Sequence, residues 1–217
     1  MSSAYIKCYM CDAKAVGKEH VPPRCLFPKR RDLASGEDLR KELLTVPSCN
    51  LHNSEKSGDD EYFLNVLTSI VGINEVGRQH YNKQIRRRNS KNPSIIRRFA
   101  DRSIEINGQL AFEVEIERLD VFIEHLACAL YMAHFKSKWH GDVEWLPEFL
   151  VQIQSTHEEQ EEIKIVKGID SEFNKIALHG MNKEVFMYQV AESDKLIKMR
   201  LYFYDNCKIL LIFPNKI

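Results

Sequence analysis

The stretches CYMCDAKAVGKEHVPPRCLFP, residues 8 to 28, and LLTVPSCNLHNSEKSGDDEYF, residues 43 to 63, decide the fold of the N-terminal part of the chain. Each carries one pair of residues at chelating spacing: Cys8 with Cys11, and Cys49 with His52. Two such pairs complete a tetrahedral site, and three thiolates with one imidazole suit zinc rather than Mg²⁺ or Ca²⁺. We therefore expect these four side chains to form a structural zinc site.

Two other interpretations of these cysteines stay open at this point. Two unrelated cysteine pairs, inert in the core, would show the same spacing. Cys25 is a rival fourth ligand if His52 serves elsewhere, although Cys25 has no partner at chelating spacing. The zinc pattern is preferred because its two halves repeat the same spacing on either side of a long connection.

A closed zinc site performs no chemistry, because a catalytic metal needs an open coordination position. The residues that such a site would position are Glu19, His20 and Asn53. Glu19 is a hard oxygen ligand suited to Mg²⁺ or Mn²⁺, and the amide oxygen of Asn53 could complete that site. His20 is neutral near pH 7 and can take a proton from water. Adjacent residues on a strand point to opposite sides, so Glu19 and His20 can serve different roles.

The order of these residues resembles the HNH nuclease family, whose core is a β-hairpin and a helix around a metal, the ββα-metal motif. The resemblance covers about the first 70 residues. It implies His20 as general base, and Glu19 and Asn53 as ligands of a catalytic Mg²⁺ or Mn²⁺. Lys56 is expected either to neutralise a neighbouring acid or phosphate, or simply to cap or solvate the helix. The sequence departs from the family pattern at two places. The second zinc pair is C-x-x-H, where C-x-x-C is commoner, and Asn53 stands in place of the family's last histidine.

The fold class expected for the whole chain is α+β. Residues 1–75 are predicted to form the zinc-stabilised HNH motif, 76–102 a basic linker or helical segment, and 103–217 an α+β domain with a partner-binding or regulatory role. Apolar spacing predicts helices over 50–71 and 119–136, and Asn107-Gly108 predicts a hairpin within 103–117. Short strands of a small antiparallel sheet are expected at 163–166, 175–178, 185–190, 197–204 and 208–213. The tip of the first hairpin, KRRDLASGEDLRKE, is expected to be polar and mobile.

Charge is distributed unevenly, although the net charge is zero. Residues 1–102 hold 19 Lys and Arg against 12 Asp and Glu, and residues 103–217 hold the reverse. The excess positive charge therefore falls in the half that carries the predicted site. Phosphate contacts are expected from the basic residues Lys56, Arg86, Arg87, Arg88, Arg97 and Arg98. A solvated surface or a protein interface is the alternative for this basic stretch.

The expected function is a metal-dependent endonuclease acting on DNA, with double-stranded DNA as the expected partner. The resemblance to small standalone HNH proteins also implies a defence role and an ATPase or sensor protein as partner. A non-catalytic zinc module and an RNA-directed nuclease are the alternatives. Scattered cysteines, the absence of an apolar leader pattern and the absence of a long apolar run favour a cytoplasmic protein.

Overall fold

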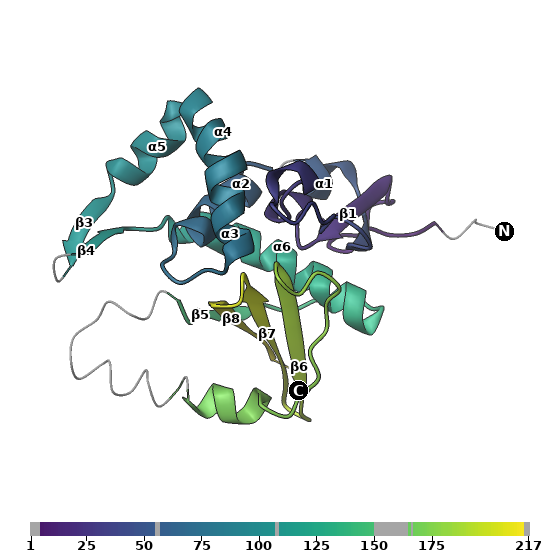
Figure 1. The fold of residues 1–217 in the computed structure, drawn as a ribbon. Helices are drawn as coiled ribbons and strands as arrows, with labels where there is room; N and C mark the ends of the chain where they lie inside the picture. Colours follow the sequence, from purple (N-terminus) through teal and green to yellow (C-terminus); the bar gives the residue numbers. More distant parts are fainter. Residues whose placement is uncertain (1–4, 55–56, 107–108, 150–164, 166, 215–217) are drawn as a thin grey trace.

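The computed structural model describes residues 5–54, 57–106, 109–149, 165 and 167–214. The chain is a mixture of helices and small antiparallel sheets, as expected for an α+β protein (Figure 1). Lys56, the Asn107-Gly108 turn and most of the acidic segment around residue 160 lie outside the described residues. None of the helices in the described part is long and apolar enough to cross a membrane.

The N-terminal part is a β-hairpin followed by helices. Strand β1 (Gly17–Val21) pairs antiparallel with β2 (Leu44–Ser48), and α1 (Asn50–Ser54) starts directly after β2. Helix α2 (Ser57–Ser69) follows, so the helix predicted over 50–71 is present as two helices around the undescribed residues 55–56. Two short 3₁₀ turns, η1 (Arg24–Leu26) and η2 (Arg30–Asp32), shape the connection between the strands.

The tip of this hairpin is less polar than the sequence suggested. Leu33 and Leu39 are 8% and 2% exposed, and the carboxylate-bearing Asp32 is also buried. The Arg40 guanidinium donates to the carbonyl of Phe27 through Nε at 2.8 Å and Nη2 at 2.6 Å. The tip therefore packs on the rest of the molecule, because two leucines in a charged stretch are enough to anchor it.

The basic stretch is helical over most of its length. Helix α3 (Glu75–His80) continues through a π-helical turn, η3 (Tyr81–Ile85), into α4 (Arg86–Lys91). Asn92 interrupts the helix, and Pro93 starts α5 (Pro93–Ala100), since proline is favoured in the first turn of a helix and not in its interior. Strands β3 (Ser103–Ile106) and β4 (Gln109–Phe112) then pair antiparallel, which confirms the hairpin predicted there.

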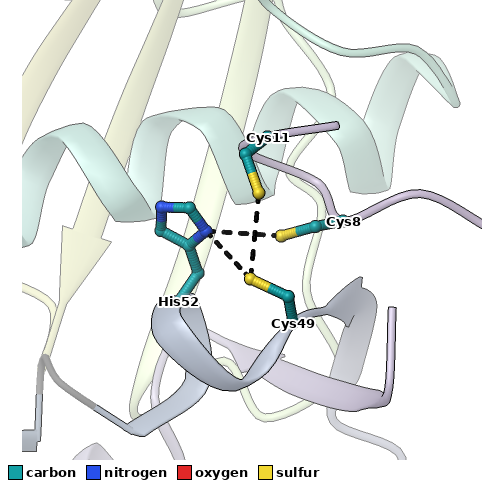
Figure 2. A group of neighbouring side chains, drawn as sticks. All are labelled: Cys8, Cys11, Cys49 and His52. Carbon is teal, nitrogen blue, oxygen red and sulfur yellow. Dashed lines mark hydrogen bonds between the residues drawn. The ribbon is translucent and has the colours of Figure 1, made fainter. Parts of the chain in front are cut away.

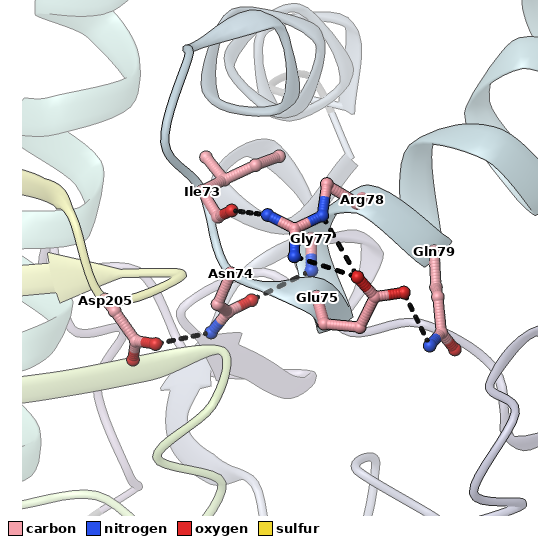
Figure 3. Close-up of polar contacts among 7 residues, drawn as sticks. All are labelled: Ile73, Asn74, Glu75, Gly77, Arg78, Gln79 and Asp205. Atoms are coloured by element: carbon pink, nitrogen blue, oxygen red, sulfur yellow. Dashed lines mark hydrogen bonds and ion pairs between the residues drawn. The ribbon is translucent and has the colours of Figure 1, made fainter.

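The start of α3 is tied to the C-terminal sheet. Asn74 caps the helix, because its side-chain oxygen accepts from the Gly77 N–H at 3.0 Å (Figure 3). The Asn74 amide nitrogen also donates to the carboxylate of Asp205 at 3.0 Å. Gly77 allows a close approach, since a Cβ there would lie 3.0 Å from the Tyr204 ring. One cap therefore links the helices of the first half to the turn between the last two strands.

Helix α6 (Ile116–Phe135) is the central element, and it confirms the helix predicted at 119–136. It contacts β1, β2 and α2, and Figure 1 shows it between the N-terminal hairpin and the C-terminal sheet. Side chains from all three parts belong to one hydrophobic cluster; Phe63 stacks on Phe122 at a centroid distance of 4.0 Å and meets Phe203 edge-on. The core therefore contains residues from both sides of the boundaries predicted after residues 75 and 102. The division into domains at these boundaries stays a prediction.

The C-terminal sheet has the strand order β5-β8-β7-β6. Its strands are β5 (Glu144–Pro147), β6 (Phe186–Glu192), β7 (Leu196–Phe203) and β8 (Cys207–Pro214). The last three confirm the strands predicted at 185–190, 197–204 and 208–213. Odd-numbered residues of β7 and β8 belong to the main core, so this face of the sheet turns toward α6.

The strand predicted at 175–178 is wrong, and the strand predicted at 163–166 lies outside the described residues except for Ile165. Ile165 and residues 167–173 are helical. Residues 175–178 form a turn and an extended segment that meets β6 through the bridge His179–Tyr188 and through the Gln189 amide, which donates to the Ile176 carbonyl. Ile169 and Phe173 are spaced by four, so a helix places both against Leu210 on the outer face of the sheet. Arg200 on that face is 2% exposed and is paired with Glu148 and Asp170, both at 2.6 Å.

A buried histidine connects α3 to the sheet. His80 is fully buried, and its Nδ1 lies 2.9 Å from the Tyr204 hydroxyl, which donates to the Leu26 carbonyl at 2.6 Å. Because the Tyr204 proton is used in that bond, Nδ1–H of His80 must be the donor to the Tyr204 oxygen. Burial, and then the charges of Arg40 and Arg88, lower the pKa of His80 to about 3. The imidazole therefore stays neutral in the folded protein.

We predict that His80 makes the protein less stable as the pH falls. An unfolded histidine takes up a proton near pH 6.5 and the folded one does not, so protonation favours the unfolded chain. The free energy of unfolding should fall by about 1.4 kcal/mol between pH 8 and pH 5.5 through this residue. His80→Gln should be less stable at pH 8 but should lose less stability on acidification. Denaturant titrations of both proteins measure the difference, and equal pH dependence would refute the assignment.

Candidate metal centre and adjacent pocket

Cys8, Cys11, Cys49 and His52 converge at one point, with one ligand atom from each lying within 4.8 Å of the others (Figure 2). The His52 Nδ1 atom lies 3.2 Å from the Cys49 sulfur and 3.6 Å from the Cys8 sulfur. The Cys11 and Cys49 sulfurs are 3.8 Å apart. Zinc bond lengths of about 2.3 Å to sulfur and about 2.0 Å to nitrogen give tetrahedron edges of about 3.8 Å between sulfurs and about 3.5 Å between sulfur and nitrogen. The cluster could therefore bind a metal such as zinc.

Local backbone structure sets up this cluster. Cys8 and Cys11 lie in a turn that is closed by the Cys8 N–H bonding to the Ala13 carbonyl at 2.9 Å and by a bridge between Lys7 and Lys14. The Tyr9 N–H donates to the Pro47 carbonyl at 2.8 Å, which fixes this turn against β2. Cys49 follows β2 directly and His52 lies in α1, so the second pair is held by the strand-to-helix junction.

The protonation of the cysteines also suits a cation. Burial raises the pKa of Cys8, but hydrogen bonds from the backbone at Met10, Cys49 and Cys11 outweigh it and lower the pKa to about 6. For Cys11, a backbone hydrogen bond at Ala13 lowers the pKa, while burial and the neighbouring Cys49 and Cys8 together raise it. Neighbouring thiolates repel one another, and a bound divalent cation offsets this repulsion. Thiolates are also the form of cysteine that binds metal.

Cys25 is not part of the cluster. Its sulfur lies 3.8 Å from the Asp60 carbonyl, and it lines a separate pocket together with His20. Among the described residues, the group that could hold a metal consists of the four predicted ligands. The geometry therefore favours His52 over Cys25 as the fourth ligand.

Two residues beside the cluster could not be identified from the sequence. His125 of α6 lies with its ring centroid 5.5 Å from that of His52, and its Nδ1 lies 2.9 Å from the Tyr9 hydroxyl. Lys138 donates to the Cys11 carbonyl at 2.6 Å. Their sequence positions give no signal, because only the packing of α6 on the hairpin brings them to the cluster.

A second pocket, of about 260 Å³, lies next to the metal cluster and contains the three residues predicted for catalysis. Glu19 and His20 come from β1, and Asn53 comes from α1, one residue after the cluster ligand His52. Glu19 is 7% exposed, while His20 is half-buried and Asn53 is exposed. Gly17 of β1 lies beside Asn53, since a Cβ there would make an ordinary contact of 3.9 Å with the Asn53 amide nitrogen.

His20 has the properties of a proton acceptor. Burial is the main cause that lowers its pKa, followed by the positive charge of Arg24, while Glu19 acts in the opposite direction and Arg40 adds to the lowering. The imidazole is therefore neutral at pH 7. Its Nδ1 atom is buried and has no hydrogen-bond partner in the described part of the chain. The neutral ring can accept a proton from a water molecule in the pocket.

Two further carboxylates line the same pocket. Asp60 and Glu61 of α2 face it together with Glu19. The sequence signal for them is a run of three acids that begins six residues after Asn53. The pocket therefore contains three carboxylates and one amide, but among the described residues the ligand atoms that converge are those of the Cys/His cluster and not those of these carboxylates.

The predicted phosphate-binding arginines lie in different environments. The Arg87 guanidinium is 3.5 Å from Asp32, and Arg88 donates to Glu61 at 3.1 Å. Arg98 is 3.5 Å from Glu115. Arg86 and Arg97 are exposed. Part of the charge of the basic stretch is therefore used within the protein.

Comparison with protein-family models, with curated proteins and with solved structures found no match to this chain. The function proposed below is accordingly supported by the donor chemistry and geometry of the two neighbouring sites and by the order of their residues in the sequence.

We predict that the purified protein carries about one tightly bound zinc ion, measured by elemental analysis. Structural zinc supplies about 10 to 16 kcal/mol in small zinc-finger peptides, so Cys49→Ser should lose the metal and unfold or aggregate. Cys128→Ser removes a buried cysteine outside the cluster and should keep the zinc. Soluble, folded wild-type protein without zinc would refute a structural zinc site.

Proposed function

We propose that this protein is an HNH-type, metal-dependent endonuclease in which β1, β2 and α1 form the ββα-metal motif. The observation that carries the proposal is that Glu19, His20 and Asn53 line one pocket directly beside the Cys/His cluster. A hairpin and a helix supply these residues in the order that the resemblance to the HNH family implies. Zinc at the cluster has a structural role, because all four of its coordination positions are taken by protein side chains.

His20 acts as general base in the proposed reaction. Its neutral imidazole takes a proton from a water molecule, which attacks the phosphorus of a phosphodiester bond in line with the leaving oxygen. Arg24 lines the same pocket and disfavours the charged form of His20, so the ring is ready to accept a proton at neutral pH.

Glu19 and Asn53 would hold the catalytic ion, Mg²⁺ or Mn²⁺, with Asp60 as a further oxygen donor at the same pocket. Their donor set fits such an ion, because carboxylate and amide oxygens are its preferred ligands. Bound there, the ion would stabilise the negative charge that develops on the phosphate and on the leaving oxygen.

Double-stranded DNA is the proposed substrate, since the basic residues gather in the half of the chain that contains the pocket. The resemblance to small standalone HNH proteins supports a defence role in the cytoplasm with an ATPase or sensor protein as partner. The acidic C-terminal half, which carries the sheet β5–β8, is the proposed surface for that partner.

We predict that His20→Ala abolishes cleavage while zinc content, melting temperature and DNA binding stay unchanged. A general base contributes about 10² to 10⁴ in rate, and loss of the base should fall at the upper end. The assay incubates plasmid DNA and RNA with wild type and variant, with and without Mg²⁺ or Mn²⁺. His140→Ala is the matched control, because His140 is an exposed histidine away from the pocket.

The same assay separates the alternative functions. Cleavage of RNA but not of plasmid would replace DNA by RNA as the substrate. A wild type that binds nucleic acid and cleaves neither substrate with any metal would support a non-catalytic zinc module. Full activity of His20→Ala would reject the proposed base.

We further predict that Glu19→Ala and Asn53→Ala weaken the response to the catalytic metal. Each variant removes one oxygen donor, so the Mg²⁺ concentration for half-maximal cleavage should rise, and excess Mg²⁺ should partly restore the rate. Zinc content should not change, because neither side chain belongs to the Cys/His cluster. An unchanged Mg²⁺ requirement in both variants would remove these residues from the catalytic metal site.

A further inference from the structure

A third pocket is lined almost entirely by positive charge. It has a volume of about 480 Å³ and lies between the tip of the first hairpin and helix α4. The tip contributes two cations at η2, and the helical segment contributes three cations and an amide. The lining residues are Lys29, Arg31, Gln84, Arg87, Arg88 and Lys91. No carboxylate lines this basic pocket.

Helical spacing explains which members of the basic stretch face the basic pocket. Gln84, Arg87, Arg88 and Lys91 are three or four residues apart and so form one stripe along the helix. Arg86 lies on the opposite side of the helix and is exposed. Of the three consecutive arginines, Arg87 and Arg88 therefore line the pocket and Arg86 does not. The other wall is the hairpin tip, which the buried residues Leu33 and Leu39 anchor to the protein.

The charges of the basic pocket are not balanced within the described part of the protein. Arg87 is 3.5 Å from Asp32 and Arg88 is 3.1 Å from Glu61, but Lys29, Arg31 and Lys91 form no ion pair among the described residues. The five cationic side chains of the pocket therefore have two carboxylate partners among the described residues. A dianion or two neighbouring monoanions would reduce the repulsion among the cations.

The pocket also holds donors without acceptors. The Nε and Nη2 atoms of Arg88 are buried and have no hydrogen-bond partner among the described residues. Buried donors that stay unpaired cost free energy, and a guanidinium edge matches the geometry of phosphate oxygens. The excess positive charge of the pocket suits a phosphate, and a turn of the Arg88 side chain would expose its buried N–H donors to that ligand.

One ion pair separates the basic pocket from the candidate catalytic pocket. Glu61 lines the catalytic pocket, and its carboxylate accepts the hydrogen bond of Arg88, which lines the basic pocket. A chain of phosphates that occupies one pocket can therefore continue into the other.

We propose that the basic pocket binds a backbone phosphate of a polynucleotide whose neighbouring phosphodiester lies at His20. Capture of a phosphate group follows from the charges and donors of the pocket alone, while its assignment to the substrate strand rests on the proposed nuclease function. Binding there positions the strand for cleavage and carries no base specificity, because the pocket contacts phosphate only.

The test compares two double variants of the full-length protein. Arg31→Ala with Lys91→Ala removes two cations of the pocket that are in no described ion pair. Lys41→Ala with Lys83→Ala removes the same charge from exposed positions in the same half of the chain that do not line the pocket. Fluorescence anisotropy measures binding of a duplex oligonucleotide without terminal phosphates, at several salt concentrations and without added Mg²⁺, so that cleavage does not enter.

The pocket variant should bind the duplex roughly tenfold more weakly and show a salt slope smaller by about 1.8, the loss of two phosphate contacts. The control variant should change the affinity by less than about twofold. Equal weakening in the two variants would overturn the proposal. A second measurement follows the ³¹P NMR line of inorganic phosphate. If wild type broadens this line, the pocket variant does not, and the two bind the duplex equally well, the pocket binds free phosphate and the proposal of a polynucleotide is overturned. Wild type that binds through the pocket but never cleaves would contradict the nuclease function and not the pocket.

Discussion

The convergence of the two chelating pairs is the constraint on which the N-terminal part depends. Cys8 and Cys11 lie in a turn before β1, while Cys49 and His52 lie at the junction of β2 and α1. One metal ion bound by all four would join both strands of the hairpin to the helix. Glu19, His20 and Asn53 come from the same strand and helix, so the metal that shapes the hairpin would also set the distances between them.

Helix α6 packs against the Cys/His cluster. His125 lies against His52, and the same helix buries Leu126 and Leu130 in a core shared with β7 and β8. The N-terminal sites are thus held by a hydrophobic core that extends to the end of the described chain. A mutation in the C-terminal sheet can for this reason affect the pocket through stability, although the sheet contributes no residue to it.

The sequence predicted the Cys/His cluster and the pocket beside it because their residues follow fixed local spacings and a known order. Three C-terminal strands and α6 were predicted because they are long and strongly periodic. The helix at Ile169 and Phe173 was missed, since its short apolar spacing is visible only against Leu210 of the sheet. The buried tip, the role of His125 and the basic pocket depend on contacts between distant segments, which local spacing does not contain.

The central claim is that two chemically different metal sites lie side by side, one of thiolates and imidazole and one of oxygen donors. Anomalous diffraction from crystals grown with Mn²⁺, recorded at the zinc and manganese absorption edges, tests it directly. The account predicts a zinc peak among Cys8, Cys11, Cys49 and His52 and a manganese peak between Glu19 and Asn53. Manganese absent from that pocket, or zinc bound there with an empty Cys/His cluster, would contradict it.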